Sequence, residues 1–498
     1  MTWESAMPTL IVGTSLLTGL LIFFLEEKRQ RLRSTLNLLG AGLKLVFVGI
    51  IIVGTLQGRE YEFRFPLVLG FDFLLRVDML SLLFVTLSGV LWFVTTIYAI
   101  GYLEGSEHRS RFFGFFSICV AASTGIALAG NLITFFIFYE FLTLSTYPLV
   151  VHRGTEESLR AGRTYLWYTI TGGTVLFVGV AWLNVLVGDV DFSHAGSLAS
   201  VAPYYHTELI AIFVLLIAGL GVKAALVPLH GWLPVAMVAP APVSALLHAV
   251  AVVKAGAFGI VRVVYDVFGV SFANSLGVLT PLAILASITI IYGSLRAMTQ
   301  DDLKKRLAYS TISQVSYITL GVALFGITGT IGSLVHLVHQ GIMKITLFFC
   351  AGNVAETLGL HRISEMNGIG RRMPVTMGAF TVAALGMIGL PPIAGFISKW
   401  YLALGGLEAG KPWVVVVLLV SSLLNAAYFL PILHAAWFKK PSQSWSPRTG
   451  KLETSAMLLV PPVITAGFSL AAGLFAASNG SPLALARQIA ELLYYSSP

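Results

Sequence analysis

Fourteen stretches of this chain are long and apolar enough to cross a membrane as helices. A membrane-spanning helix needs about 20 predominantly apolar residues, and fourteen segments of the 498-residue sequence meet that requirement. They are 8–25, 36–56, 79–100, 112–129, 131–151, 164–188, 208–227, 240–262, 274–295, 309–326, 328–352, 375–398, 412–437 and 455–477. The sequence therefore predicts an all-α polytopic membrane protein.

The scarcity of charge excludes other classes of protein. Only 11% of the residues are charged and 56% are hydrophobic, whereas a soluble domain carries about 25% charged residues. A soluble enzyme, a disordered chain and a nucleic-acid-binding protein are thereby excluded. Cys119 and Cys350 lie in apolar segments without metal-ligand or redox spacing, so we expect neither a metal nor a bound cofactor. Met1–Pro8 lacks the basic region of a cleavable signal peptide.

The Lys and Arg residues of the connecting loops predict the orientation of the chain. Loops after odd-numbered segments hold 20 of them, including Arg448 and Lys451. Loops after even-numbered segments hold 5, namely Arg59, Arg64, Arg76, Arg262 and Lys411. Cytoplasmic loops carry the excess of basic residues. With an even number of segments, both termini are then expected on the outer side of the membrane.

Two proline- and glycine-rich interruptions fall within apolar stretches. The first extends from Lys223 to Pro234 and the second from Gly389 to Trp400. Proline removes a backbone donor and clashes with the preceding turn, so such a break is tolerated in lipid only where protein or a water-filled cavity satisfies the freed groups. Paired interruptions in two halves of a transporter are typical of inverted repeats with a site between them. Each interruption here carries a lysine.

Five ionisable residues are expected inside the membrane: Glu140, Lys223, Lys254, Lys344 and Lys399. Each costs roughly 2.5–3.5 kcal/mol to insert. For Lys399, which is near the end of its segment, a side chain that extends to the headgroups is the alternative. Lys44 is expected to extend to the headgroups in this way. For Glu140 the alternative is an ion pair that only fixes helix packing.

These residue types are suited to proton transfer. Burial lowers the pKa of a lysine and a nearby carboxylate raises it again, so a Glu140–Lys223 pair that separates and re-forms would load and release a proton. His336, Gln340 and Lys344 are spaced i, i+4, i+8 and share one helix face. For His230, His248 and His336, proton relay and plain packing are equally open interpretations. For His339 we favour packing.

At these residues the chain resembles the antiporter-like subunits of respiratory complex I, of Mrp-type Na⁺/H⁺ antiporters and of membrane-bound hydrogenases. The likeness extends over about residues 72–440. It rests on five motifs in order, at 138–144, 222–234, 241–256, 302–310 and 389–399.

The resemblance implies a role for each buried group. Glu140 and Lys223 correspond to the paired residues of a first half-channel, and Lys254 with His248 to the centre. Lys344 and His336 line a second half-channel, and Lys399 is the terminal ionisable residue. Some relatives have histidine where this chain has Gln340, which orders water but does not titrate, so a direct His–His–Lys relay is not expected. His230 and Gln340 are kept as possible relay residues.

The resemblance also implies an organisation with two inverted five-helix repeats and external termini. The expected parts are N-terminal helices in 1–111, a first repeat in 112–262, a second repeat in 274–437, and a last helix and tail in 438–498. The protein is expected in the inner membrane of a bacterial or archaeal cell. Its expected partners are other membrane subunits, including homologous antiporter-like subunits, together with H⁺ and Na⁺.

The function indicated is proton conduction within a multi-subunit membrane complex. The favoured interpretation is the D subunit of an Mrp-type Na⁺/H⁺ antiporter. The alternative is a proton-pumping membrane subunit of a redox-driven complex such as NADH-quinone oxidoreductase or a hydrogenase, with no redox or hydrolytic site in this chain. A solute carrier is disfavoured, because lysines spread over four helices do not converge on a pocket. A scaffold with inert charges is a further, weaker alternative.

Overall fold

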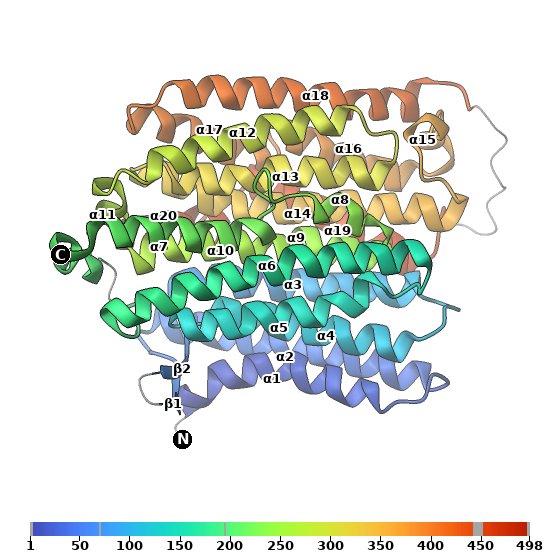
Figure 1. Cartoon of the computed structure of the whole chain (residues 1–498). Helices are drawn as coiled ribbons and strands as arrows, with labels where there is room; N and C mark the ends of the chain where they lie inside the picture. Colours follow the sequence, from blue (N-terminus) through green and yellow to red (C-terminus); the bar gives the residue numbers. More distant parts are fainter. Residues whose placement is uncertain (1–2, 69–70, 194–195, 442–451, 496–498) are drawn as a thin grey trace.

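The computed structural model describes residues 3–68, 71–193, 196–441 and 452–495, and its helices lie side by side in one bundle (Figure 1). Twelve of the described helical segments are long and apolar enough to cross a membrane. They are α1 (Trp3–Phe23), α2 (Gln30–Leu56), α3 (Met79–Tyr102), α4 (Arg109–Leu128), α5 (Leu132–Val150), α6 (Glu156–Val187), α7 (Ala202–Lys223), the broken helix Ala241–Val267, α12 (Leu279–Met298), α14 (Ile327–Leu358), α18 (Trp413–Phe438) and α19 (Ala456–Leu474). The prediction of an all-α polytopic membrane protein is confirmed.

The expected count of fourteen spans is not confirmed by these criteria. The two predicted spans that are not among these twelve helices are segments 309–326 and 375–398. The first lies in α13 (Leu303–Val322), which begins with Lys and Arg residues and carries many buried hydroxyl groups. The second is divided between α16 (Pro374–Ile388) and α17 (Ala394–Glu408), each of 15 residues. Their polar or short sequences explain why neither qualifies as a long apolar helix.

The bundle is also interrupted where the sequence predicts one uniform span. Segment 240–262 consists of α9 (Ala241–Ala249) and α10 (Val252–Arg262), and the backbone at Val250 and Ala251 is not helical. We call this the α9–α10 break. A π-helix (Val263–Val267) follows α10.

The remaining elements are short and, apart from the C-terminal α20, connect the spans. They are the strands β1 (Glu62–Val68) and β2 (Phe71–Arg76), the helices α8 (Trp232–Val235), α11 (Val270–Ser275), α15 (Ile369–Arg372) and α20 (Pro482–Tyr495), and the 3₁₀ helices Ser197–Ser200, Ala236–Val238 and Ile363–Glu365. The two strands form an antiparallel hairpin in which Glu62 is opposite Arg76. Helix α20 lies in the part of the chain expected to be a tail.

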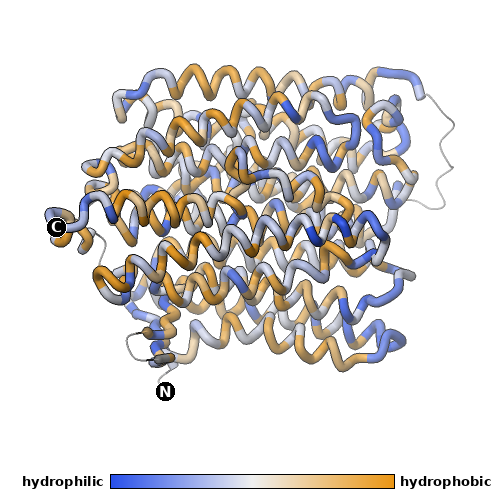
Figure 2. The backbone as a smooth tube through the Cα atoms, in the orientation of Figure 1, coloured by the Kyte–Doolittle hydropathy of each residue, from blue (hydrophilic) through white to orange (hydrophobic). Residues whose placement is uncertain are grey.

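The two ends of the bundle differ in composition. The hairpin and both chain ends lie at the left in Figure 1, and we call this the hairpin end. Hydrophilic connections gather at the opposite end (Figure 2), which carries the loops after α1, α3 and α5 and is called the basic-loop end. Arg448 and Lys451 lie outside the described residues. The placement of both chain ends at the hairpin end agrees with an even number of crossings, while the side of the membrane stays a prediction.

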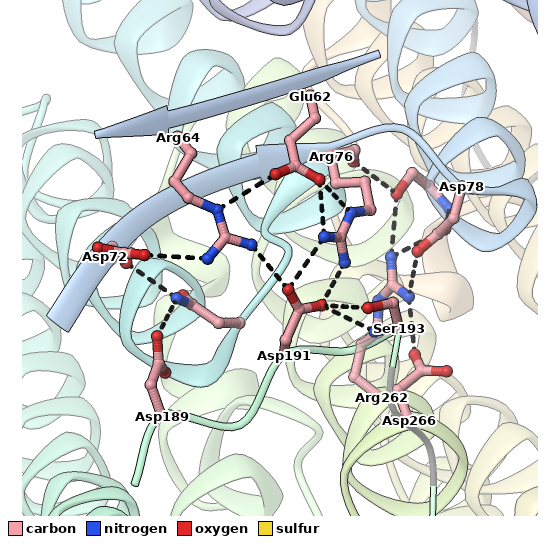
Figure 3. Close-up of polar contacts among 12 residues, drawn as sticks. Glu62, Arg64, Asp72, Arg76, Asp78, Asp189, Asp191, Ser193, Arg262 and Asp266 are labelled. Carbon is pink, nitrogen blue, oxygen red and sulfur yellow. Dashed lines mark hydrogen bonds and ion pairs between the residues drawn. The ribbon is translucent and has the colours of Figure 1, made fainter. Parts of the chain in front are cut away.

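An ion-pair cluster fastens the hairpin to the loop after α6 (Figure 3). Arg64 donates to Asp72 and Asp191 at 2.9 Å, and Arg76 pairs with Glu62 at 2.7 Å and also with Asp191. We call these five residues the hairpin cluster. Burial alone would raise the pKa of Asp191, but hydrogen bonds from Arg76 and Ser193 hold it well below its usual range.

Beside the hairpin cluster, Arg262 forms a separate buried ion-pair group. Its guanidinium donates to Asp78 and Asp266 at 2.7 Å and to Ser81 at 2.9 Å. Its side chain is 2% exposed, at the end of α10. The prediction that Arg262 is a loop residue is therefore wrong, because the helical backbone continues past the predicted end of the span as the π-helix Val263–Val267 and keeps this arginine inside the protein.

Helix α14 is the buried axis of the bundle. Every residue from Gly329 to Val354 is buried, and the helix packs against α9, α13, α16, α17, α19 and α20. His336, His339, Gln340 and Lys344 all lie on this stretch. Their polar groups can be satisfied only by neighbouring helices or by internal water, since no face of the stretch is open to lipid.

Candidate functional site

Lys223 is the last residue of α7, where the helix ends inside the bundle. Ala225 has a φ of 56°, which does not continue a right-handed helix. The backbone donor of Val227 is satisfied by Thr289 of α12 at 3.1 Å, and the indole of Trp232 donates to the carbonyl of Val222 at 2.7 Å. The first predicted interruption is therefore a true break whose freed polar groups are bonded by protein.

Glu140 and Lys223 are neighbours without an ion pair. Lys223 Nζ donates to the backbone carbonyl of Tyr139 and lies 3.4 Å from the centre of the Tyr139 ring. The carboxylate of Glu140 faces α6, where a Cβ on Gly173 would lie 2.3 Å from Oε1. That Oε1 is buried and has no hydrogen-bond partner within the described chain. The two residues therefore form a separated pair. The ammonium of Lys223 is bonded to a backbone carbonyl, and Oε1 of Glu140 is not bonded to any described residue.

Lys254 lies on α10 directly after the α9–α10 break. Its side chain is fully buried, and Nζ donates to the carbonyl of Leu337 on α14 at 2.7 Å. A Cβ on Gly256 would lie 2.2 Å from the backbone nitrogen of Ala224. Glycine at 256 therefore lets α10 approach the end of α7 at Lys223 while Lys254 contacts α14. Through these contacts α10 connects the end of α7 with α14.

His230 and His248 make no bond to a lysine among the described residues. His248 is fully buried on α9 and stacks on Phe348 of α14 at 4.5 Å, and neither of its ring nitrogens has a partner within the described residues. His230 lies in the break after α7 and contacts the ring of Tyr292 at 4.9 Å. For both residues, relay by way of internal water and plain packing remain open.

His336 on α14 is bonded on both sides of its ring. Nδ1 lies 2.8 Å from the hydroxyl of Ser398 on α17, and Nε2 lies 3.1 Å from the carbonyl of Gln314 on α13. The carbonyl is only an acceptor, so Nε2 carries hydrogen. The hydroxyl of Ser398 also lies 3.2 Å from the carbonyl of Gly395, so its single hydrogen is given either to that carbonyl or to Nδ1. The ring also stacks on Tyr317 at 5.1 Å. His336 is thereby fixed between three helices.

A chain of hydrogen bonds leads from Lys344 toward Lys399. Lys344 Nζ donates to Ser310 Oγ at 2.8 Å, Ser310 and Tyr428 are 2.8 Å apart, and the Tyr428 hydroxyl donates to Asn425 Oδ1 at 2.8 Å. Because Tyr428 donates to Asn425, Ser310 must donate to Tyr428. The three bonds therefore have the same donor direction. We call these residues, with Lys399, the second-half network.

The second-half network ends on the backbone at the second interruption. The amide of Asn425 donates to the carbonyl of Met387 at 3.2 Å. Lys399 Nζ donates to the same carbonyl at 3.0 Å, to that of Ile388 at 2.8 Å and to Ser422 Oγ at 3.0 Å. Lys399 is 8% exposed and lies within the first half of α17. Its ammonium group is thus bonded inside the protein, to the carbonyls of the last two residues of α16.

Four members of this region were not identified from the sequence: Ser310, Ser422, Asn425 and Tyr428. They are neutral polar residues on α13 and α18, and nothing in the sequence distinguishes them from the many other hydroxyl groups of the chain. Gln340 is buried with no partner for its amide, and His339 is buried with no partner for its ring within the described residues. Neither lies in the network.

The site as a whole is a row of four buried lysines on α7, α10, α14 and α17. Within the described chain no carboxylate lies within 4.0 Å of any of their nitrogens. Their acceptors are backbone carbonyls and hydroxyl groups. Such a lysine can lose its proton without leaving a buried carboxylate unpaired, which suits reversible proton transfer better than a permanent ion pair does.

A family model matches more than half of the chain. Residues 129–425 match the family described as NADH:quinone oxidoreductase/Mrp antiporter, TM, and residues 68–113 match NADH-Ubiquinone oxidoreductase (complex I), chain 5 N-terminus. The N subunit of the NADH-quinone oxidoreductase of Desulforudis audaxviator is 36% identical over 434 residues, which cover 84% of each chain. The D subunit of the Na⁺/H⁺ antiporter of Bacillus subtilis is 27% identical, with 92% of each chain covered.

A solved structure is similar over the whole chain. One chain in the structure of the Mrp complex from Dietzia sp. DQ12-45-1b superposes with a TM-score of 0.87 at 25% identity, and the match covers 100% of this chain and 98% of that one. The fold described above is therefore also found in a subunit of a multi-subunit membrane complex.

Proposed function

This chain belongs to the family of NADH:quinone oxidoreductase and Mrp antiporter membrane subunits, and on that premise we propose that it conducts protons as one subunit of a larger membrane complex. The observation that carries the proposal is the row of buried lysines bonded to carbonyls and hydroxyls. A buried charge is costly in a membrane and marks ion pathways and proton relays. Four of them on four adjoining helices outline a lateral path.

The proposed path has three steps. A proton reaches Lys223 at the break after α7, and the separation or approach of Glu140 changes how tightly it is held. It passes to Lys254, whose helix is in close contact with the end of α7 at Gly256. It then reaches α14 and leaves by way of Lys344, the second-half network and Lys399. Water is the carrier wherever no side chain bridges two of these groups.

Two sources of driving force remain candidates, and each has an observation in its favour. The 36% identical relative is a subunit of an NADH-quinone oxidoreductase, which favours a redox-driven complex. The match over the whole chain to a subunit of an Mrp complex favours exchange of Na⁺ for H⁺, with this chain as the D subunit of such an antiporter. Both candidates use the same path in this chain and differ in the partner subunits.

Replacement of Lys254 by methionine tests the path. In membrane vesicles that contain the intact complex, we expect K254M to lower proton translocation at least about a hundredfold, because a positioned proton-transfer group contributes about 10²–10⁴-fold. Lys305 is an exposed lysine on α13, and K305M is the matched control with an expected rate near wild type. An assembled K254M complex that translocates protons at the wild-type rate would disprove the proposal.

The driving force is decided by a separate measurement on the wild-type complex. Sodium-dependent dissipation of a pH gradient in vesicles without any electron donor indicates the antiporter. Proton uptake that requires an electron donor, together with flavin or iron–sulfur subunits in the purified complex, indicates the redox-driven alternative.

A further inference from the structure

Lys44 is a further buried lysine, and it lies away from the row described above. It is on α2, its side chain is 0% exposed, and Nζ donates to the hydroxyl of Thr124 on α4. The same nitrogen lies 5.2 Å from the centre of the Trp92 ring on α3. The prediction that Lys44 extends to the headgroups is therefore wrong, because its side chain is directed between three helices.

The surroundings of Lys44 do not fix a permanent charge. Within the described chain no carboxylate lies within 4.0 Å of its nitrogen. The hydroxyl of Thr124 donates to the carbonyl of Val120 at 2.7 Å, so its oxygen is free to accept from Lys44. A hydroxyl and an aromatic face are weaker partners than a carboxylate, and both tolerate a neutral amine. Lys44 thus has the same kind of environment as the lysines of the row.

A line of polar contacts between α2 and α4 leads from the basic-loop end to Lys44. Arg33 donates to Ser110 at 2.8 Å, Ser117 donates to Asn37 at 3.1 Å, and Lys44 donates to Thr124. We call these six residues the α2–α4 seam. Arg33, Asn37 and Lys44 lie on one face of α2 over a rise of about 16 Å, and their partners recur every seventh residue along α4.

The outer end of the α2–α4 seam is charged and accessible. Arg33 lies 3.7 Å from the carboxylate of Glu27, whose side chain is 45% exposed in the loop after α1. Burial by itself raises the pKa of Glu27, but backbone hydrogen bonds from Ser110 and Arg109 hold it below its usual value. This carboxylate therefore stays ionised at neutral pH beside the outer end of the seam.

The inner end of the seam adjoins the centre of the lysine row. Ser123, the neighbour of Thr124 on α4, donates to the carbonyl of Val250 at 3.4 Å. Val250 belongs to the α9–α10 break, and Lys254 lies on the next turn. On α3, the indole nitrogen of Trp92 and the hydroxyl of Ser88 are buried and have no partner within the described residues. Trp92 and Ser88 are one turn apart on one face of α3, so water beside Lys44 would find donors and acceptors there.

We propose that Lys44 is an additional proton-transfer residue, which takes up protons from the basic-loop end through the α2–α4 seam and delivers them to the α9–α10 break and Lys254. In the step, the ammonium of Lys44 loses one proton to water and becomes a neutral amine, and the amine regains one proton from hydronium arriving along the seam. No electrons move. The inference rests on the proposed function, because it adds a second source of protons to the path through the lysine row.

Two substitutions at Lys44 separate proton transfer from structural roles. K44Q keeps a hydrogen-bond donor but is always neutral, and K44R keeps the charge but cannot be deprotonated in a protein. If Lys44 transfers protons, both variants lower translocation at least about tenfold in vesicles of the intact complex. A wild-type rate in K44R would show that Lys44 is only a fixed charge, and a wild-type rate in K44Q that it is only a packed donor; either result overturns the proposal.

A milder pair of variants decides the question if the Lys44 variants fail to assemble. S117A removes one donor of the seam, and S287A removes a buried serine on α12 whose hydroxyl, within the part of the chain that the structure describes, is bonded only to the carbonyl of Ala283 in its own helix. We expect S117A to lower translocation about threefold and S287A to leave it unchanged. Equal rates in S117A and wild type would overturn the proposal.

K254M distinguishes this inference from the function on which it rests. If K254M abolishes translocation while the Lys44 and Ser117 variants do not affect it, only the proposal that protons enter by way of Lys44 is wrong. If K254M itself has no effect, the path through the lysine row is wrong as well.

Discussion

Around Lys223, Oε1 of Glu140 and the hydroxyl of Tyr165 are buried and make no hydrogen bond within the described chain. Around Lys344, by contrast, the hydroxyls of Ser310 and Tyr428 are each bonded on two sides. Unpartnered groups such as Gln340 occur in the second half too, but they lie beside its network and not in it. In the first half, around Lys223, the Glu140 carboxylate is not hydrogen-bonded to any described residue. In the second half, around Lys344, hydrogen-bond donors and acceptors form a continuous chain.

The difference suggests different tasks for the two halves. A buried polar group without a partner costs about 1–3 kcal/mol, so an unbonded carboxylate is poised to gain a partner when a side chain or water moves. A network in which every group is already hydrogen-bonded gains no further bond when its neighbours move, and it is more rigid. We therefore expect the first half to change its bonding during the cycle and the second half to conduct along a fixed path.

A matched pair of tyrosine variants gives the strongest test of this contrast. Both hydroxyls lie on fully buried side chains, but that of Tyr428 has two partners and that of Tyr165 has none within the described residues. Loss of two hydrogen bonds of about 0.5–1.5 kcal/mol each should make Y428F about tenfold slower in proton translocation. Y165F should remain within about twofold of wild type. Equal effects of the two variants would contradict the contrast.

A substitution at Gly173 tests whether the unbonded state of Glu140 matters. In G173A the new Cβ would lie 2.3 Å from Glu140 Oε1, so the carboxylate must turn away from α6. The displaced group is the flexible end of a side chain, and the fold should be kept. We expect translocation to fall about threefold, which corresponds to a loss of under 1 kcal/mol.

The matched control for G173A is G378A on α16, where an added Cβ meets no atom within 4 Å. It should behave as wild type. If G173A also behaves as wild type in vesicle assays, the position of the Glu140 carboxylate does not limit the rate, and the first half is not the moving part.

Asp191 provides the smallest expected effect, on stability and not on rate. The pKa of Asp191 is below its usual value, because hydrogen bonds from Arg76 and Ser193 outweigh the effect of burial. Its contribution to folding is thus fully present above about pH 4 and is lost as the pH falls through the lower native pKa. D191N should cost about 1 kcal/mol of stability at pH 7 and nothing at a pH below the native pKa.

Thermal unfolding of the detergent-solubilised protein at several pH values measures this effect. Asp191 lies in the loop after α6, so loss of the hairpin cluster should expose the first half to proteolysis before the second. A D191N protein with slowed translocation at neutral pH would instead show that the hairpin cluster takes part in conduction.

The apolar segments and the charges they contain were sufficient to predict the helical class and the burial of Lys223, Lys254, Lys344 and Lys399. The interruptions after Lys223 and at Gly389 were predicted because proline and glycine mark them. The α9–α10 break was not, since Val250 and Ala251 are ordinary helix-compatible residues. Lys44 was misplaced because distance from a helix end does not tell which way a side chain points.

Contacts between distant polar residues were beyond prediction for a different reason. Ser310 and Tyr428 are 118 positions apart, and neither residue is charged. Only the packing of α12, α13 and α18 brings them together. Local sequence patterns predict which residues share a helix face, but not which face of another helix they meet.

Three lysines of the row donate to main-chain oxygens: Lys223 to Tyr139, Lys254 to Leu337, and Lys399 to Met387 and Ile388. Such an acceptor is present whatever side chain the residue bears. Relatives can therefore exchange Leu337 or Met387 for other apolar residues over evolutionary time and retain the bond, and covariation between sequences will not report it. The acceptor of each of these three lysines is therefore determined by the conformation of the backbone. Only a change in that conformation removes the hydrogen bond.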